Sequence, residues 1–231
     1  MKRLPLKLLI KKWFPSSWKE RLNPLPIVNI PKGSQGYVQR LASFIRATDA
    51  LSFDELHQDF LPFLPVAPAQ ILDLGAGIGR DAFVLSERGH QVHALEPLDA
   101  FREVGQIRYV SDQLIWVEDS LPELKSLMQS DLRFDFILCS GVWHHLTPEE
   151  QLIGLHSVQT LLANGGHFAV SLRHGPAGAG PHVFPIDVAM LLEAAQGIGL
   201  LVSLILRDQA SLLPNKPDVR WTRLVLQKPA Y

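Results

Sequence analysis

Residues 71–80 read ILDLGAGIGR, an apolar strand-like run that passes through a glycine-rich turn into the start of a helix. Gly75, Gly77 and Gly79 allow left-handed backbone conformations and let a ligand approach the main chain closely. The first N–H groups of the following helix have no partner within that helix, so they are available to a ligand. The stretch therefore predicts a strand-turn-helix unit that binds a nucleotide-like cofactor.

The spacing of this turn argues against two common phosphate-binding motifs. The dinucleotide fingerprint needs a third glycine or alanine five positions after the first, and that position holds Arg80. A P-loop needs Gly-Lys-Ser or Gly-Lys-Thr, and neither follows the turn. Glu96 comes directly after the next predicted strand, where a carboxylate can accept hydrogen bonds from both ribose hydroxyls of an adenosine. We therefore expect the cofactor to contain adenosine.

Short apolar runs alternate with helical patterns from Gln70 onward, which is typical of βαβ units and a mostly parallel sheet. The predicted strands span residues 71–74, 91–95, 114–117, 134–139 and 167–172. Two final runs, residues 200–206 and 220–226, are expected to close the sheet as an antiparallel pair. The sequence thus predicts a Rossmann-like α/β fold with helices on both faces.

Two capping boxes mark the starts of helices. Ser52 pairs with Glu55, and Thr147 pairs with Glu150 ahead of an apolar face of helical period. The predicted helices span residues 37–48, a segment from 53 onward, a segment from 148 to the turn at 164–166, and residues 186–196. The first two precede the sheet and form an N-terminal helical extension.

Composition is that of a single compact enzyme domain with an appendage. A chain of 231 residues that is 47% hydrophobic can bury one substantial core. We expect residues 1–34 to form a basic, proline-containing arm and residues 35–231 to form the cofactor-binding domain with its leading helices. The single cysteine, Cys139, excludes an internal disulfide and fits a reducing, cytoplasmic setting. No apolar stretch reaches the roughly 20 residues of a transmembrane helix, and we expect no signal peptide.

The formal net charge of -1 is unevenly distributed. Residues 1–21 hold seven Lys or Arg and one acidic residue, whereas the remaining residues hold 15 basic and 22 acidic ones. An acidic body repels nucleic acid phosphates, so a nucleic acid partner is not expected. The basic arm, which includes Trp13 and Trp18, has two interpretations: a solvated tail, or a contact with an anionic membrane surface, with RNA or with another partner.

From Gln70 to Lys228 these motifs resemble the class I S-adenosylmethionine (SAM)-dependent methyltransferase family. The resemblance implies that the turn after the first strand wraps the methionine part of SAM and that Glu96 binds its ribose. It also implies adenine recognition after the third strand, with Asp119 as the acidic side chain, and contacts to the methionine chain after the fourth. The implied cofactor-binding residues are Asp73, Gly75, Ala76, Gly77, Gly79, Glu96, Asp119, Ser120, Ser140, Gly141 and Trp143.

Within this family, residues 79–82 and 88–90 are similar to bacterial small-molecule and tellurite-resistance-type methyltransferases. The chain has neither the Asn-Pro-Pro-Tyr or Asp-Pro-Pro-Tyr motif of base amino methylation nor the Pro-Cys of cytosine carbon methylation. Cys139 lies in a predicted strand and is interpreted as a core residue. The resemblance implies methyl transfer to an oxygen, nitrogen or sulfur atom of a small molecule. Methylation of RNA or protein, and non-catalytic binding of SAM or an adenine nucleotide, remain the alternatives.

His144 and His145 are the candidate catalytic residues. They lie just beyond the fourth predicted strand, where either could take a proton from the acceptor as a general base. The alternative is that both only pack or bond the backbone. No residue pattern predicts a metal site.

Three residues are candidates for substrate binding. Arg173 and His174 are expected to open a polar, glycine-rich loop after the fifth strand, where Arg173 could bind an acidic group of the substrate. The alternative is a mobile connection with solvated histidines. Tyr37, with Phe44 on the same helix, is expected to cover the bound cofactor as part of a lid.

Overall fold

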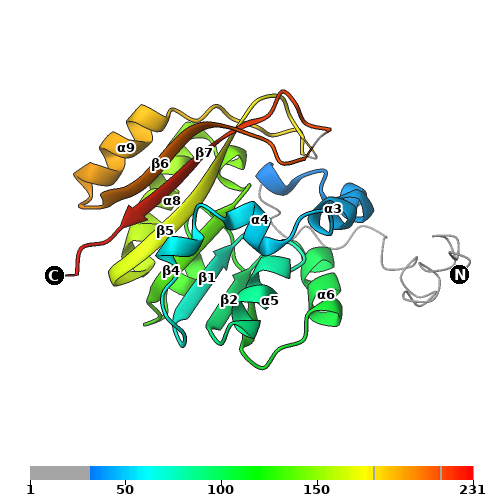
Figure 1. Ribbon diagram of the computed structural model, residues 1–231, viewed down its shortest axis with the longest axis horizontal. Helices are drawn as coiled ribbons and strands as arrows, with labels where there is room; N and C mark the ends of the chain where they lie inside the picture. The colour runs from blue at the N-terminus through cyan, green and yellow to red at the C-terminus, as the bar shows by residue number, and fades with distance from the viewer. Residues whose placement is uncertain (1–31, 179, 214, 231) are drawn as a thin grey trace, which may run out of the picture. The chain divides into compact units, whose positions relative to one another are not determined.

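The computed structural model describes residues 32–178, 180–213 and 215–230, whose arrangement is drawn in Figure 1. Residues 1–31 of the predicted basic arm, with Trp13 and Trp18, lie outside the described residues, so the role of the arm stays a prediction. Within the described ranges, no helix combines the length and the apolar character that crossing a bilayer requires.

A seven-stranded mixed sheet forms the centre of the domain, in the order β3-β2-β1-β4-β5-β7-β6 (Figure 1). The neighbouring strands from β3 to β5 are parallel, whereas β7 is antiparallel to both β5 and β6. The strands are β1 (Gln70–Leu74), β2 (Gln91–Leu95), β3 (Leu114–Val117), β4 (Phe134–Ser140), β5 (Leu162–His174), β6 (Leu201–Ala210) and β7 (Arg220–Gln227). The predicted mostly parallel Rossmann-like sheet with an antiparallel C-terminal pair is confirmed.

The strand order reverses at β1. The chain proceeds from β1 to β2 and β3 on one side and then crosses to β4 on the other side. In open α/β sheets a ligand binds beyond the carboxyl ends of the strands at such a switch point. Leu74 pairs with Leu95 at the ends of β1 and β2, and Ser140 pairs with Ser171 near the ends of β4 and β5. The segments that follow these strands therefore meet at one edge of the sheet.

Helices cover both faces of the sheet (Figure 1), as predicted. Ile71 of β1 shares a core with Leu85 of α5, whereas its neighbour Leu72 shares the opposite core with Leu155 of α8. Successive side chains of a strand point to opposite faces, so the apolar side chains of β1 supply both cores. The α-helices are α3 (Leu41–Thr48), α4 (Phe53–His57), α5 (Arg80–Glu87), α6 (Asp99–Arg108), α7 (Lys125–Met128), α8 (Pro148–Leu161) and α9 (Val188–Gly197).

The N-terminal helical extension is present but more segmented than predicted. The expected helix over residues 37–48 consists of a 3-10 turn, η2 (Val38–Arg40), followed by α3, because Arg40 leaves helical geometry with φ of -109° and ψ of 11°. Further 3-10 turns are η1 (Lys32–Ser34), η3 (Leu61–Phe63) and η4 (Trp143–His145). Both predicted capping boxes are formed, at the starts of α4 and α8.

β5 is longer than predicted at both ends. Helix α8 ends at Leu161, and Leu162 is already extended and paired with Phe134 of β4. The expected stop at residues 164–166 therefore lies inside the strand, where Gly165 has a φ of 81° and the register of the β4–β5 ladder shifts. At the other end β5 continues through residues 173 and 174, because both pair with β7. These two residues belong to the sheet and not to a loop, which corrects the prediction.

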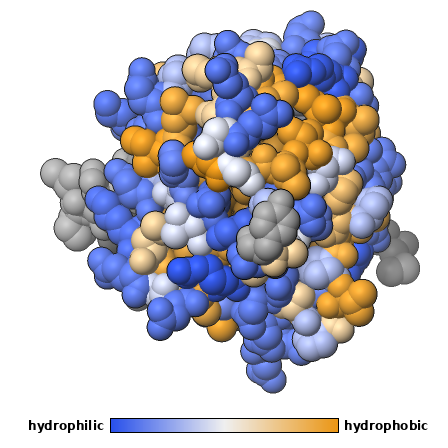
Figure 2. All heavy atoms as spheres, turned by 90° about the vertical axis from the view of Figure 1, so that its left-hand side faces the viewer, coloured by the Kyte–Doolittle hydropathy of each residue, from blue (hydrophilic) through white to orange (hydrophobic). Residues whose placement is uncertain are grey.

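β6 forms one edge of the sheet and carries exposed apolar side chains at its start, at Leu201 and Val202. Figure 2 views the side of the molecule on which α9 and β6 meet and shows hydrophobic residues gathered on part of that surface. Later along the strand, a positive φ at Asp208 accompanies a shift in the β6–β7 register. Such bulges twist an edge strand and limit further pairing.

Candidate functional site

The turn after β1 is built from left-handed glycines. Gly75, Gly77 and Gly79 have φ angles of 72°, 59° and 84°, a range that other residues rarely adopt. The N–H groups of Gly75 and Ala76 donate to the carbonyl oxygen of Leu95 over 2.8 and 2.9 Å. A Cβ on Gly75 would lie 2.5 Å from Cγ2 of Val142. The turn is therefore tied to the end of β2 and held against the segment that follows β4.

Glu96 places a buried carboxylate directly against this turn. Its Oε2 accepts from the N–H of Gly77 over 3.0 Å, and its Oε1 accepts from the N–H of Leu98 over 3.0 Å. Burial raises the pKa of Glu96 to about 7, although these two hydrogen bonds and the charge of Arg102 act in the opposite direction. Each carboxylate oxygen has a second lone pair, so the group can still accept two ligand hydroxyls.

Asp73 lies beneath the turn and keeps one unused acceptor. It is 2% exposed, and its Oδ2 has no hydrogen-bond partner among the described residues. Burial, reinforced by the neighbouring Asp81 carboxylate, holds the pKa of Asp73 well above its usual range. A buried acceptor without a donor is costly, and a ligand N–H can satisfy it. The turn, Glu96 and Asp73 thus fit the ribose hydroxyls and the amino group of SAM.

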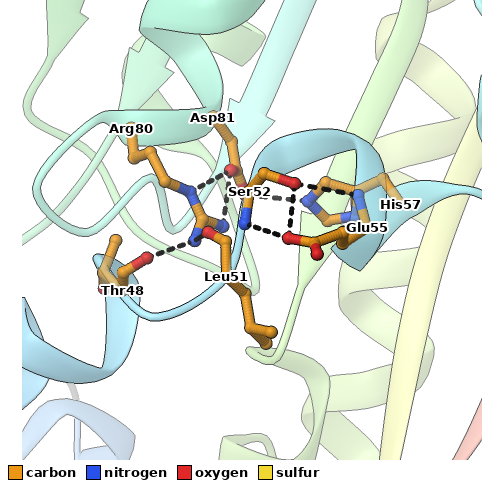
Figure 3. A network of polar contacts seen from close by, with 7 residues as sticks. All are labelled: Thr48, Leu51, Ser52, Glu55, His57, Arg80 and Asp81. Carbon is orange, nitrogen blue, oxygen red and sulfur yellow. Dashed lines mark hydrogen bonds and ion pairs between the residues drawn. The ribbon is translucent and has the colours of Figure 1, made fainter. Parts of the chain in front are cut away.

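A polar network fastens the leading helices to the first turn of α5 (Figure 3). The guanidinium of Arg80 donates to the carbonyl oxygens of Thr48 and Leu51 over 2.7 and 3.0 Å and also pairs with Asp81. Nε2 of the buried His57, on α4, lies 2.9 Å from Oδ2 of Asp81. Burial by itself raises the pKa of Asp81, but His57 and Arg80 together lower it. The network fixes α3 and α4 relative to the glycine turn.

The aromatic side chains of the leading segment lie over the turn, where the lid was expected. Phe44 of α3 approaches Gly77 so closely that a Cβ there would lie 2.9 Å from Cζ of the ring. Phe44 also packs edge-on against Phe101 of α6, with ring centroids 4.9 Å apart. The Tyr37 ring contacts both of these rings. The lid residues therefore meet the cofactor turn, while their role toward a ligand stays a prediction.

Asp119 is engaged by its own loop. Its Oδ2 accepts from the N–H and hydroxyl of Ser126 and from the N–H of Leu127, and its Oδ1 accepts from the N–H of Ser120. The carboxylate thereby caps the short helix α7, and only Oδ1 keeps a lone pair for an adenine amino group. The adenine contact of Asp119 and Ser120 stays a prediction.

The segment after β4 separates into buried and accessible parts. Ser140 and Gly141 end the strand, and the N–H of Gly141 donates to Oγ of Ser171 over 2.8 Å. Trp143 is 0% exposed and packs against Phe168 inside the core. Its Nε1 has no hydrogen-bond partner among the described residues, and its predicted contact with the cofactor stays a prediction. The core position of Cys139 is confirmed, since it is fully buried in β4.

His145 is held in one orientation by three segments. Its Nδ1 lies 2.7 Å from the carbonyl oxygen of His182, and its Nε2 lies 2.7 Å from the hydroxyl of Tyr37. A carbonyl can only accept, so Nδ1 carries the proton and Nε2 receives the hydroxyl of Tyr37. Burial lowers the pKa of His145, which keeps the ring neutral.

His144 points into a more enclosed space than its neighbour. It is 4% exposed, and burial holds its pKa well below the usual range. Its Nδ1 has no partner among the described residues. Arg173, on β5, is buried nearby, and His174 bonds Thr222 of β7 through Nε2 over 3.0 Å. His144, His145 and Arg173 therefore gather on one side of the site, whereas His174 is occupied within the sheet.

The sequence analysis did not identify Arg102 of α6, which connects the segments on the cofactor side of the site. Its guanidinium donates to the carbonyl oxygen of Glu96, pairs with Asp99, and lies 2.9 Å from Glu118. It thereby links the segments after β2 and β3. An Asp and an Arg three residues apart in the first turn of a helix beyond the ribose acid are a weak signal that could have revealed it.

Comparisons with known proteins agree with this geometry. Residues 71–166 match the family model of a methyltransferase domain. An uncharacterized methyltransferase from Staphylococcus carnosus (strain TM300) is 26% identical over 104 residues, which cover 45% of this chain and 47% of the relative. The chain thus spans about half the length of the curated relative that it matches.

Solved structures share the fold at low sequence identity. The N-methyltransferase NodS from Bradyrhizobium japonicum WM9, in complex with S-adenosyl-L-homocysteine (SAH), gives a TM-score of 0.66 at 15% identity, covering 86% of this chain and 99% of that one. The 1,6-didemethyltoxoflavin-N1-methyltransferase from Burkholderia thailandensis, with 1,6-didemethyltoxoflavin and SAH bound, gives a TM-score of 0.62 at 19% identity, covering 89% of this chain and 93% of that one. At such low sequence identities, the similarity to these structures shows the fold alone.

Proposed function

We propose that this chain transfers the methyl group of SAM to an oxygen, nitrogen or sulfur atom of a small molecule, because residues 71–166 match the family model of a methyltransferase domain and lie in a mostly parallel α/β sheet. The observation that carries the proposal is the buried Glu96 carboxylate bonded to Gly77 of the left-handed turn. It supplies acceptors for a ribose at the switch point of the sheet. Both similar solved structures named above contain SAH.

On this proposal, the cofactor residues divide between two ends of the ligand. Glu96 accepts the ribose hydroxyls, while Asp73, Gly75, Ala76, Gly77 and Gly79 surround the methionine part. Ser140 and Gly141 line the methionine chain, and Asp119 and Ser120 meet the adenine. When bound, SAM supplies a methyl group on a positively charged sulfur that leaves as a neutral thioether. The main tasks of the protein are then to align the two reactants and to exclude water.

We assign the general base, where the acceptor needs one, to His145 in preference to His144. Its tautomer leaves Nε2 free of a proton, and its lowered pKa keeps it able to take one at neutral pH. Burial raises the pKa of Tyr37 to about 12, so its hydroxyl stays protonated and can pass a proton between acceptor and His145. The more enclosed His144 remains neutral and packs behind this pair.

The test begins with calorimetry of SAH and SAM on the full-length chain, where we expect dissociation constants in the micromolar range. The chain is then incubated with methyl-labelled SAM and a cell extract that is separated into small-molecule, RNA and protein fractions. Label in the small-molecule fraction supports the proposal. Label in RNA or protein would establish the alternative acceptors, and tight binding without product in any fraction would indicate a binding module. Failure to bind either compound would overturn the proposal.

A further inference from the structure

Arg173 is a buried cation without an acidic partner. The side chain leaves β5 one residue before the strand ends, and the residue is only 6% exposed. Among the described residues its guanidinium forms one long hydrogen bond, 3.4 Å to the carbonyl oxygen of Gly175, and no ion pair with Asp or Glu. Burial of an uncompensated charge is costly, so such a group is expected to meet an anion in the working protein.

The groups around Arg173 do not offset its positive charge. Burial lowers the pKa of Lys216, in the β6–β7 connection, and the charge of Arg173 lowers it further. The same charge also lowers the pKa values of His144 and His145 after the larger effect of burial. Asp208, on β6, is paired with Arg220, whose Nε and Nη2 donate to Oδ1 and Oδ2 of Asp208 over 2.8 and 3.0 Å. Arg173 therefore lies beside two neutral imidazoles, and among the described residues no carboxylate pairs with it.

The strand register places this cluster beside the point where the methyl group is expected. Arg173 lies two residues beyond Ser171, whose hydroxyl holds Gly141 at the end of β4. Directly opposite Arg173 on β7 is Trp221. Its ring lies 3.8 Å from the position of a Cβ on Gly141 and 6.4 Å, centroid to centroid, from His144. Indole, imidazole and guanidinium thus surround the end of β4.

We propose that Arg173 binds an anionic group of the acceptor, a carboxylate or a phosphate ester, while Trp221 contacts the apolar part of the same molecule. The substrate class is then a small organic anion, an assignment that rests on the proposed function. A guanidinium has five N–H donors in a fork that matches either anion. Anchoring the far end of the acceptor in this way orients its reactive atom toward Gly141.

Three matched probes test the proposal on the full-length chain saturated with SAH: benzoate, phenyl phosphate and the neutral benzamide. Calorimetry is expected to show benzoate and phenyl phosphate binding at least about tenfold more tightly than benzamide, in line with a charge-assisted hydrogen bond. Arg173→Gln should remove this preference and leave the affinity for SAH within about twofold. Arg133→Gln, at an exposed arginine bonded only to the adjacent carbonyl of Leu132, should change neither value.

Equal affinity for all three probes, or an unchanged preference in Arg173→Gln, would overturn the assignment. If Arg173→Gln does not fold, Arg173→Lys decides, because it keeps the positive charge but lacks the five-donor fork of the guanidinium. A loss of about threefold for the anionic probes then supports the proposal, and no loss overturns it. A wild-type chain that binds SAH but not the anions contradicts only this inference. A chain that fails to bind SAH contradicts the proposed function itself.

Discussion

The two halves of the site differ in charge and in how the sequence supplies them. The centre of the cofactor half, at the ends of β1 and β2, comes from one stretch of the chain, residues 73–96, which holds the carboxyl groups of Asp73 and Glu96. The acceptor half, at the ends of β4, β5 and β7, is basic, and its residues are scattered from Tyr37 to Trp221. An acidic half suits a donor that carries a positive sulfur and an amino group, whereas a basic half suits an anionic acceptor. Each half can therefore be tested without disturbing the other.

The largest effect should come from Glu96→Gln. The variant loses a charged acceptor for the ribose hydroxyls, and the loss of two charge-assisted hydrogen bonds, about 3 kcal/mol in all, corresponds to about 100-fold in the Kd for SAH. Calorimetry checks this against Glu87→Gln, at an exposed position of α5, which should bind as the wild type does. A change below about threefold would mean that Glu96 serves only to shape the turn.

Arg102→Gln should lower the free energy of unfolding, because Arg102 supports the segments that form the cofactor half. The side chain joins the segments after β2 and β3, but Asp99 and Glu118 are substantially exposed, so we expect a loss of about 1.5 kcal/mol in the free energy of unfolding. Denaturant unfolding measures it. Arg108→Gln breaks the exposed pair with Asp49 and the contact of the guanidinium with the Tyr109 ring, and should cost about 0.5 kcal/mol. Equal losses would remove the special role of Arg102.

The affinity for SAH should rise with pH, and this dependence should belong to the cofactor half. The pKa of Glu96 is raised to about 7, so the carboxyl is mostly protonated at pH 6 and mostly ionised at pH 8. Since the ionised form is the better acceptor, Kd should fall about tenfold over this range. Glu96→Gln, measured in parallel, subtracts the titration of the ligand. An identical pH profile in that variant would assign the effect elsewhere.

The smallest effect should come from Phe44→Ala, which removes the ring that lies against Gly77. Loss of about 1 kcal/mol of apolar contact should weaken SAH binding about fivefold, mainly through faster release, as stopped-flow fluorescence can measure. Ser43→Ala, exposed on the same helix, is the matched control. Tighter binding by Phe44→Ala would show that the ring obstructs the ligand and does not cover it.

The difference between the halves also explains which parts of the site were predictable. The glycine turn and Glu96 were identified because their conformational needs are local: a positive φ requires glycine, and the ribose acid follows the next strand of the same βαβ unit. The alternation of strands and helices and both capping boxes were likewise local signals. The strand order confirms the first, and the starts of α4 and α8 confirm the second.

Long-range pairing decided the rest. The bond between Tyr37 and His145 joins residues 108 positions apart, and no local pattern encodes it. Arg173 was expected in a loop, but pairing with β7 extends β5 and turns this arginine into a buried cation. The burial of Trp143 likewise depends on packing against β5. The sequence by itself determined the glycine turn and Glu96, because they belong to one contiguous βαβ unit, whereas only the tertiary structure assembled the acceptor side from separate strands.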